Sequence, residues 1–189
     1  GWSDNISHNS SIVNNKVYYD GTNESISTVN DTWWMQTISC SGLELLVNNS
    51  SSGDCATVNA INRVQQLHNN DGNEPDIIAI YIGLNDLYQN KSADEFRTAY
   101  EEMLSEMTRK YVGKDVYLFT LLAFNSAHNE LYSDRFVLFN EIVKELAVKY
   151  GCTLVDLYSE VICSYFDILD YLSNDGIYPN DLAMDIISK

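Results

Sequence analysis

The sequence has few basic residues for its length. It contains 11 Lys and Arg against 27 Asp and Glu, so its formal net charge is −16. This negative charge would repel a nucleic-acid backbone and an anionic membrane surface, and we therefore expect no nucleic-acid partner. Solubility is the simplest explanation of the acidity. A neutral or cationic small-molecule substrate is compatible with the charge but not required by it.

The sequence also has no recognisable metal-binding spacing. Its cysteines form no C-x-x-C pair and join no histidine cluster, so we expect neither a metal nor another cofactor. Cysteines spread through a chain of 189 residues are more often free and buried than joined in a disulfide framework. The four are Cys40, Cys55, Cys152 and Cys163.

Membrane and targeting signals are missing as well. No apolar run reaches the roughly 18 residues that a membrane helix needs, so we expect no membrane insertion. The chain opens with polar residues rather than a signal peptide, which fits a cytoplasmic protein and equally a secreted or cell-surface protein whose leader has been removed. The length and the 45% of hydrophobic residues suit one domain over 1–189.

Apolar runs bounded by turn residues predict four buried strands. The run at 76–82 is almost entirely apolar, as expected of a parallel strand that is covered on both faces. The other three runs are 43–47, 116–122 and 153–157.

Helical patterns follow each of these strands and precede the first. The first expected helix is capped by Asp31 or Thr32 and ended by Gly42, and the second has Val58, Ile61, Val64 and Leu67 on its apolar stripe. The third begins at the capping box 92–95, and the fourth runs from Ser133 or Asp134 to Gly151. A short fifth helix is capped by Asp181. This alternation predicts a parallel sheet with right-handed crossovers and helices on both faces.

Polar turn segments follow the predicted strands at the edge where such sheets bind ligands. They are 48–53 after the first strand, 83–86 after the second, and 175–180 near the C-terminus. Each segment has a local explanation too, because Asn85 with Asp86 can form an Asx turn and Asp175 with Gly176 a plain turn.

Three motifs in these segments carry a family resemblance. Gly83-x-Asn85-Asp86 resembles the G-x-N-D block of the SGNH (GDSL-type) hydrolases, and Gly53 resembles the glycine of their preceding block. The run from Asp175 to Pro179 resembles their D-x-x-H-P block, with Tyr178 in place of the histidine. The resemblance extends from about Thr32 onward and implies a three-layer α/β/α sandwich with a flavodoxin-like sheet.

The resemblance also implies roles for these residues. The Gly53 N–H and the Asn85 side chain would stabilise the oxyanion of ester hydrolysis, and Asp175 would orient the base. Tyr178 occupies the position of that base, and Asp86 is a weaker candidate for substrate binding. The implied substrates are acyl or acetyl esters of carbohydrates, lipids or small molecules.

The nucleophile and the base have no match in the sequence. No strand ends in the family's G-D-S block, and Ser3 in Gly1-Trp2-Ser3 has no strand before it. A tyrosine phenol has a pKa of about 10, so it replaces an imidazole near 6.5 poorly. His8, His68 and His128 lie outside the motif, and His128 is expected to be a surface residue. We therefore expect the chain as given to be inactive.

The first strand of the family's sheet is thus missing from the chain. Because this strand lies between two others in a flavodoxin-like sheet, we expect residues upstream of Gly1 to supply it. The run 17–19 or a neighbouring chain is the alternative.

Two other functions are possible besides that of a hydrolase: a catalytically degenerate domain that binds a ligand, and a module that acts through protein contacts only. Trp33 and Trp34 are expected to line the core or a groove.

Overall fold

The computed structural model describes residues 29–49, 55–69, 71–122, 126–162, 171–172 and 179–189, with the backbone alone at 126–133 and 160–162. Several residues singled out from the sequence lie outside this part: Ser3, His8, the 17–19 run, Gly53, Cys163, Asp175 and Tyr178, together with the side chain of His128. The remaining cysteines form no disulfide within the described residues; Cys55 is buried as expected, whereas Cys40 is exposed and Cys152 is half-buried.

The described strands form a parallel sheet. β1 (Ile77–Ile80), β2 (Asp115–Phe119) and β3 (Thr153–Val155) lie in the order β1-β2-β3. Ile80 is in register with Leu118, and Leu118 with Leu154. The parallel sheet predicted from the strand–helix alternation is confirmed.

The strand predicted at 43–47 is wrong. These residues have no strand structure, and Leu43 is 44% exposed. The Leu43 N–H donates to the Ile38 carbonyl at 3.1 Å, so the first residue of the apolar run completes the end of a helix instead. A short apolar run does not by itself distinguish a strand from other buried or half-buried backbone.

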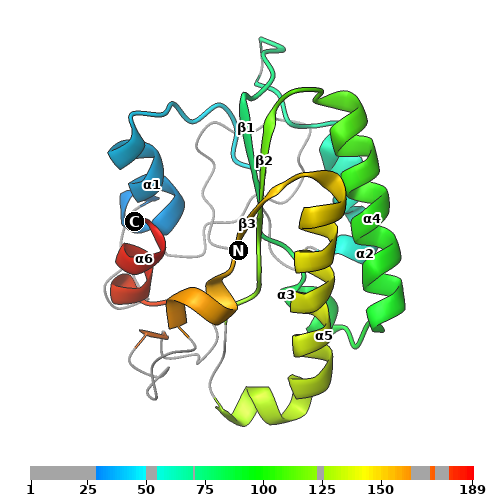
Figure 1. Cartoon of the computed structure of the whole chain (residues 1–189). Helices are drawn as coiled ribbons and strands as arrows, with labels where there is room; N and C mark the ends of the chain where they lie inside the picture. Colours follow the sequence, from blue (N-terminus) through cyan, green and yellow to red (C-terminus); the bar gives the residue numbers. More distant parts are fainter. Residues whose placement is uncertain (1–28, 50–54, 70, 123–125, 163–170, 173–178) are drawn as a thin grey trace.

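Helices cover both faces of the sheet. Figure 1 shows α1 (Trp33–Ser41) and α6 (Asp181–Ile187) on one side, and α2 (Ala56–Val64), α4 (Ala93–Lys110) and α5 (Ser126–Tyr150) on the other. The order of layers is therefore helix, sheet, helix, as predicted. A short helix, α3 (Leu84–Tyr88), follows β1, while η1 (Val29–Asp31) and the π-helix η2 (Leu157–Ile162) precede α1 and follow β3.

Several helix ends follow the predicted signals. Gly42 ends α1 in the left-handed region with φ 66°, and Gly151 follows α5 with φ 67°. Ser92 and Glu95 form the capping box at the start of α4. α4 buries one apolar stripe in the core, formed by Phe96, Tyr100, Met103, Leu104 and Met107.

Three helix predictions need correction. α2 buries Ala56, Ala60 and Val64, which are spaced four residues apart, whereas Val58 is 61% exposed. The small alanine side chains let this side of α2 pack closely against α4. α5 begins at Ser126, before the predicted caps Ser133 and Asp134. α6 is capped by Asn180 rather than Asp181, since the Asn180 side chain accepts from the Ala183 N–H at 3.1 Å.

Alternate residues of the strands enter two separate cores. Ile78, Ile80, Val116 and Leu118 face the α2, α4 and α5 side and share one buried cluster with those helices. Phe119 belongs to a smaller cluster on the other face, with Leu122, Leu157, Leu172 and Ala183 and with Trp33 packed against it. Trp33 therefore lines the core, as expected. Its ring centroid lies 5.0 Å from that of Phe119 and 6.4 Å from that of Tyr81.

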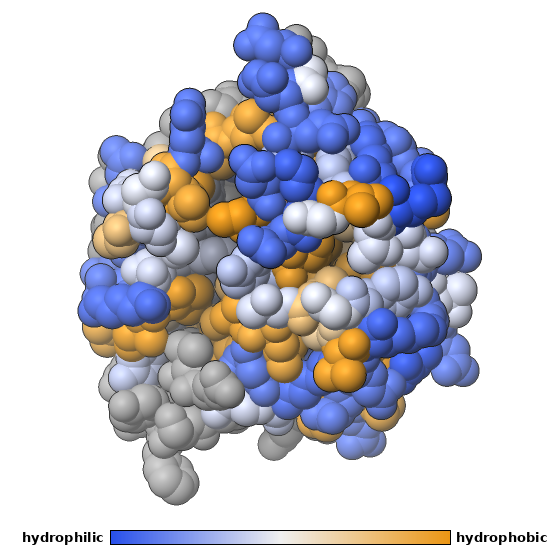
Figure 2. All heavy atoms as spheres, turned by 45° about the horizontal axis from the view of Figure 1, so that its top comes forward, coloured by the Kyte–Doolittle hydropathy of each residue, from blue (hydrophilic) through white to orange (hydrophobic). Residues whose placement is uncertain are grey.

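Figure 2 shows the side of the molecule where the strands begin. Hydrophilic residues cover most of this surface, and hydrophobic residues form separate patches between them. The polar turn segments singled out from the sequence follow the opposite ends of the strands, so the search for a site begins there.

One buried polar atom of the main core has no hydrogen-bond partner. The Tyr100 hydroxyl is fully buried between α4 and α5 and lies unpaired within the described residues, and burial raises the pKa of Tyr100. An unpaired buried hydroxyl costs about 1–3 kcal/mol. By contrast, the Tyr111 hydroxyl donates to the Val64 carbonyl at 2.8 Å.

We predict that Tyr100→Phe leaves the protein as stable or raises its free energy of unfolding by about 1 kcal/mol, because the variant removes only an unsatisfied group. Tyr111→Phe is the matched control and should lower the free energy by about 1 kcal/mol, since it removes a made bond. Urea unfolding followed by circular dichroism measures both. A loss in Tyr100→Phe as large as that in Tyr111→Phe would show that the Tyr100 hydroxyl has a partner.

Candidate functional site

The turn after β1 brings the Gly-x-Asn-Asp residues to the carboxyl edge of the sheet. Gly83 has φ 134°, and a Cβ there would lie 3.0 Å from the Phe96 ring, so both the backbone and the packing require glycine. Gly83 is followed at once by α3, whose first turn contains Asn85 and Asp86. Asn85 is half-buried and Asp86 is fully buried. This segment is thus a tight, packed turn and not a loose loop.

The Asp86 carboxylate is bonded to the first turn of α2. Its Oδ2 accepts from the Ala56 N–H at 2.7 Å, and its Oδ1 accepts from the Thr57 N–H at 3.0 Å and from the Thr57 hydroxyl at 2.7 Å. Both oxygens are therefore occupied by protein donors. The buried carboxylate is thus committed to protein donors. The assignment of Asp86 to substrate binding stays a prediction.

A buried amide side chain holds the chain after β2. The Asn140 Oδ1 atom accepts from the Leu121 N–H at 2.7 Å, and Asn140 is fully buried in α5. On the other face, the Tyr81 hydroxyl accepts from the Leu122 N–H at 3.4 Å. Neither residue was identified from the sequence, because Asn140 and Tyr81 reach backbone that is 19 and 41 residues away.

The turn after β3 is held by an ion pair. The Lys144 Nζ atom lies 2.9 Å from Asp156 Oδ2, and the other oxygen of Asp156 accepts from the Thr120 hydroxyl and the Ser159 N–H, each at 3.0 Å. Burial alone would raise the pKa of Asp156, but the bonds from Lys144, Ser159 and Thr120 keep it below its ordinary value. The bond to Asp156 correspondingly raises the pKa of Lys144, with a smaller contribution from Glu141.

These bonds give the ion pair a defined pH range. A carboxyl with a depressed pKa stabilises the fold above its unfolded pKa and loses that contribution as the pH falls through the folded value. An amine with a raised pKa contributes below its unfolded pKa and loses the contribution as the pH rises through the folded value. The pair should therefore be fully effective between about pH 5 and pH 9.

We predict that Lys144→Met lowers the free energy of unfolding by about 1–2 kcal/mol at pH 7, because it removes a charged donor from a carboxylate that is only 11% exposed. The difference from the unmodified chain should shrink towards pH 3 and again above about pH 10.5. Lys114→Met is the matched control: its partner Asp76 is 91% exposed, so little change is expected. Urea unfolding across this range measures the effect, and a pH-independent difference would contradict the assignment.

The ends of the segment that carries Asp175 and Tyr178 lie at the same edge of the sheet. Leu172 forms an antiparallel bridge with Pro179, and the Asn180 N–H donates to the Tyr171 carbonyl at 3.0 Å. Leu172 belongs to the buried cluster that contains Phe119 and Leu122, at the carboxyl end of β2. The two described ends of this segment are thus held together and packed beneath the edge. Asp175 and Tyr178 themselves lie outside the described residues.

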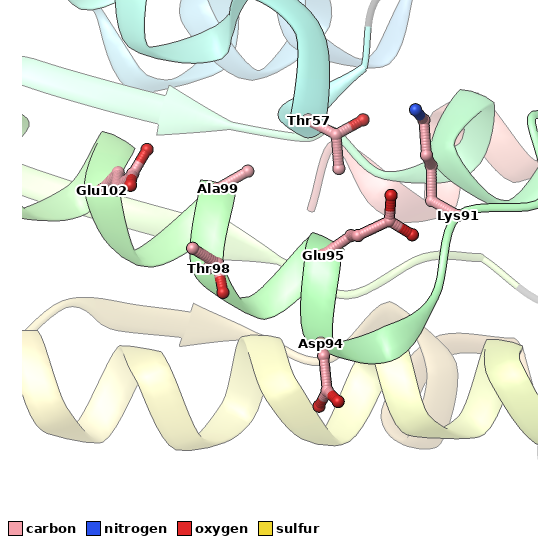
Figure 3. Close-up of a pocket in the computed structure, with 7 residues that line it drawn as sticks. All are labelled: Thr57, Lys91, Asp94, Glu95, Thr98, Ala99 and Glu102. Atoms are coloured by element: carbon pink, nitrogen blue, oxygen red, sulfur yellow. The ribbon is translucent and has the colours of Figure 1, made fainter.

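A shallow, acidic hollow lies beside the start of α2. It is lined by Thr57, Lys91, Asp94, Glu95, Thr98, Ala99 and Glu102. Figure 3 shows that Glu95 reaches into the space near Thr57 and Lys91, whereas Asp94 points away. The Glu95 carboxylate accepts from the Ser92 N–H at 2.8 Å as part of the capping box, so it is committed to α4. Its most inward carboxylate is therefore part of the α4 cap.

The described residues contain no group of three or more His, Cys, Asp and Glu side chains placed to hold a metal ion. Across the same residues, no helix has the length and hydropathy that crossing a membrane requires.

The three-layer fold, with a Gly-x-Asn-Asp turn directly after a parallel strand, matches the fold of the SGNH hydrolases. The model of the GDSL-like lipase/acylhydrolase family matches residues 20–186. This chain belongs to that family, as the motifs in its sequence implied. No curated protein sequence matches the chain significantly.

Solved structures share the fold at low sequence identity. A lipase/acylhydrolase from Enterococcus faecalis superposes with a TM-score of 0.68 at 22% identity, covering 82% of this chain and 80% of its own. A G-D-S-L family lipolytic protein from Veillonella parvula gives 0.67 at 14%, with 87% of each chain covered. The psychrotrophic esterase EstA from Pseudoalteromonas gives 0.61 at 18%, covering 84% of this chain and 82% of its own.

Proposed function

We propose that this chain is an ester-hydrolase domain with an incomplete catalytic set. Its substrates would be acyl or acetyl esters of a carbohydrate, a lipid or a small molecule. The Gly53 N–H and the Asn85 side chain would donate to the oxyanion, and Asp175 would stand beside Tyr178 in the position of the base. The nucleophile would come from a strand and G-D-S segment that residues 1–189 do not contain.

One observation carries this proposal: the turn with Asn85 is bonded to the start of α2 through the 2.7 Å contact between Asp86 and the Ala56 N–H. Gly53 precedes Ala56 by three residues, and three residues of chain reach at most about 11 Å. Two donors aimed at one point are what an acyl-transfer site needs, because the developing charge is stabilised by preorganised N–H groups. An asparagine supplies such a donor without a charge of its own.

A domain that binds the ester without cleaving it is the second candidate. It is favoured by Tyr178, because a protonated phenol does not take a proton from a serine at neutral pH. Donors that remain after loss of a nucleophile still bind the substrate and leave a small residual rate. Supplying the missing groups separates the two candidates.

We predict that the chain as given hydrolyses p-nitrophenyl acetate no faster than a heat-denatured sample. The donors alone do not form the acyl-enzyme, because this step needs both a nucleophile and a base. The release of p-nitrophenol measures the rate. Robust turnover that Ser3→Ala abolishes would show that the nucleophile lies at the N-terminus of this chain. Turnover that His128→Ala abolishes would show that the base comes from another loop.

The gain-of-function test adds the two missing groups. A chain extended upstream by a strand that ends in G-D-S and carrying Tyr178→His should gain activity by orders of magnitude over either change alone. The same extension with G-D-A in place of G-D-S is the matched control. Equal activity of the two extended chains would contradict the proposed site.

A further inference from the structure

We propose that Asp86 is a positioning residue that locks the turn carrying Asn85, the side-chain donor of the proposed oxyanion site, to the start of α2. This inference rests on the proposed function, since it concerns the geometry of the proposed oxyanion site. It differs from a substrate-binding role, because the carboxylate of Asp86 is buried and turned towards the protein.

The bonding pattern fixes an orientation as well as a distance. The two carboxylate oxygens accept from two successive backbone N–H groups, those of Ala56 and Thr57, and the Thr57 hydroxyl adds a third bond. One bond alone would let the helix end pivot about it, whereas two parallel bonds to one rigid carboxylate do not. Asp86 and Cys55 are 0% exposed and Ala56 is 4% exposed, so water does not compete for these donors.

α2 depends on this external acceptor. Its N-cap residue, Cys55, makes no side-chain capping bond, and the first turn of α2 contains no acidic residue. The unpaired N–H groups and the positive end of the helix dipole are therefore satisfied by a carboxylate from another element. In α4, by comparison, Ser92 and Glu95 supply the cap locally. The start of α4 is thus held by its own residues, whereas the start of α2 is held by a residue of another element.

The other end of the lock is equally fixed. Asp86 follows Asn85 directly, and α3 around them is closed by the bonds Gln89 N–H to Asn85 carbonyl and Lys91 N–H to Asp86 carbonyl, both at 2.9 Å. Gly83 presses against the Phe96 ring behind this turn. The lock therefore joins a rigid turn to the start of α2. Loss of the lock would free the turn that carries Asn85.

The alternative is that Asp86 acts only as a helix cap that adds to global stability. The two roles differ in what Asp86→Asn changes. A cap loosens only the amides of α2 that donate to Asp86, whereas a lock also loosens the turn at its other end, where the Gln89 and Lys91 N–H groups donate to the Asn85 and Asp86 carbonyls. The variant keeps the size of the side chain but turns an NH₂ group towards one of the N–H donors, so it breaks the paired geometry.

Native-state hydrogen exchange followed by NMR measures the protection of these amides. In Asp86→Asn we expect the Gln89 and Lys91 amides to lose at least tenfold more protection than the Leu118 amide in β2. Asp94→Asn is the matched control: this exposed carboxylate lies in the first turn of α4 and should leave all three amides unchanged. A loss confined to Ala56 and Thr57, with Gln89 and Lys91 changed no more than Leu118, would overturn the proposal.

Acetate titration tests whether Asp86 affects ligand binding at Asn85, since acetate is the simplest acyl product. In the unmodified chain, acetate should shift the Asn85 side-chain NH₂ and the Gly53 N–H resonances together. Asp86→Asn should weaken this binding at least fivefold, and Asp94→Asn should not. Unchanged affinity in Asp86→Asn would overturn the positioning role. No shift at Asn85 in the unmodified chain would instead contradict the proposed function, while the exchange result would still decide whether Asp86 locks α2.

A milder pair of variants keeps the test valid if Asp86→Asn does not fold. Thr57→Val removes only the hydroxyl bond to Asp86 and should produce a smaller loss of protection at Gln89 and Lys91, about threefold, with weaker acetate binding. Thr98→Val is the control, because this threonine is exposed on α4. Identical exchange and acetate affinity in the two variants would overturn the proposal.

Discussion

A single buried carboxylate joins the turn after β1 to the start of α2. Asp86 is fully enclosed and accepts three hydrogen bonds from the start of α2. A buried charge is tolerated only where donors satisfy it, and here they are the N–H groups that a helix end leaves unpaired. The turn after β1 and the entry to α2 therefore have one relative arrangement. The rest of the carboxyl edge is built in the same way, with Asn140 holding the chain after β2 and the Lys144–Asp156 pair holding the turn after β3.

This scaffold is that of the GDSL-like lipase/acylhydrolase family, to which the chain belongs. The proposed chemistry depends on three kinds of group: oxyanion donors, a nucleophile and a base. Oxyanion donors need rigidity more than reactivity, and the edge of the sheet supplies it. A nucleophile and a base are separate requirements, and neither follows from the fold. A family member with Tyr178 in the position of the histidine would therefore keep the architecture of an esterase without its proton transfer.

Much of the fold could be predicted from local patterns. The strand at β1, the capping box of Ser92 and the left-handed glycine after α1 each depend on residues next to one another. The errors arose where the composition of a run does not decide its structure. The 43–47 run has the composition of a strand, but its first residue, Leu43, bonds to the end of α1. Val58 and Ile61 are exposed because α2 buries the side that carries Ala56 and Ala60 instead. The hydrogen bonds of Asp86 could not be predicted from the sequence either, since its donors are about 30 residues away.

A crystal structure of the chain that locates Gly53 and Asp175 relative to Asn85 tests the central claim most directly. The account predicts that the Gly53 N–H and the Asn85 side-chain amide point to one position at the carboxyl edge of the sheet, with Asp175 on the same edge. Gly53 and Asn85 at opposite ends of the sheet would contradict it.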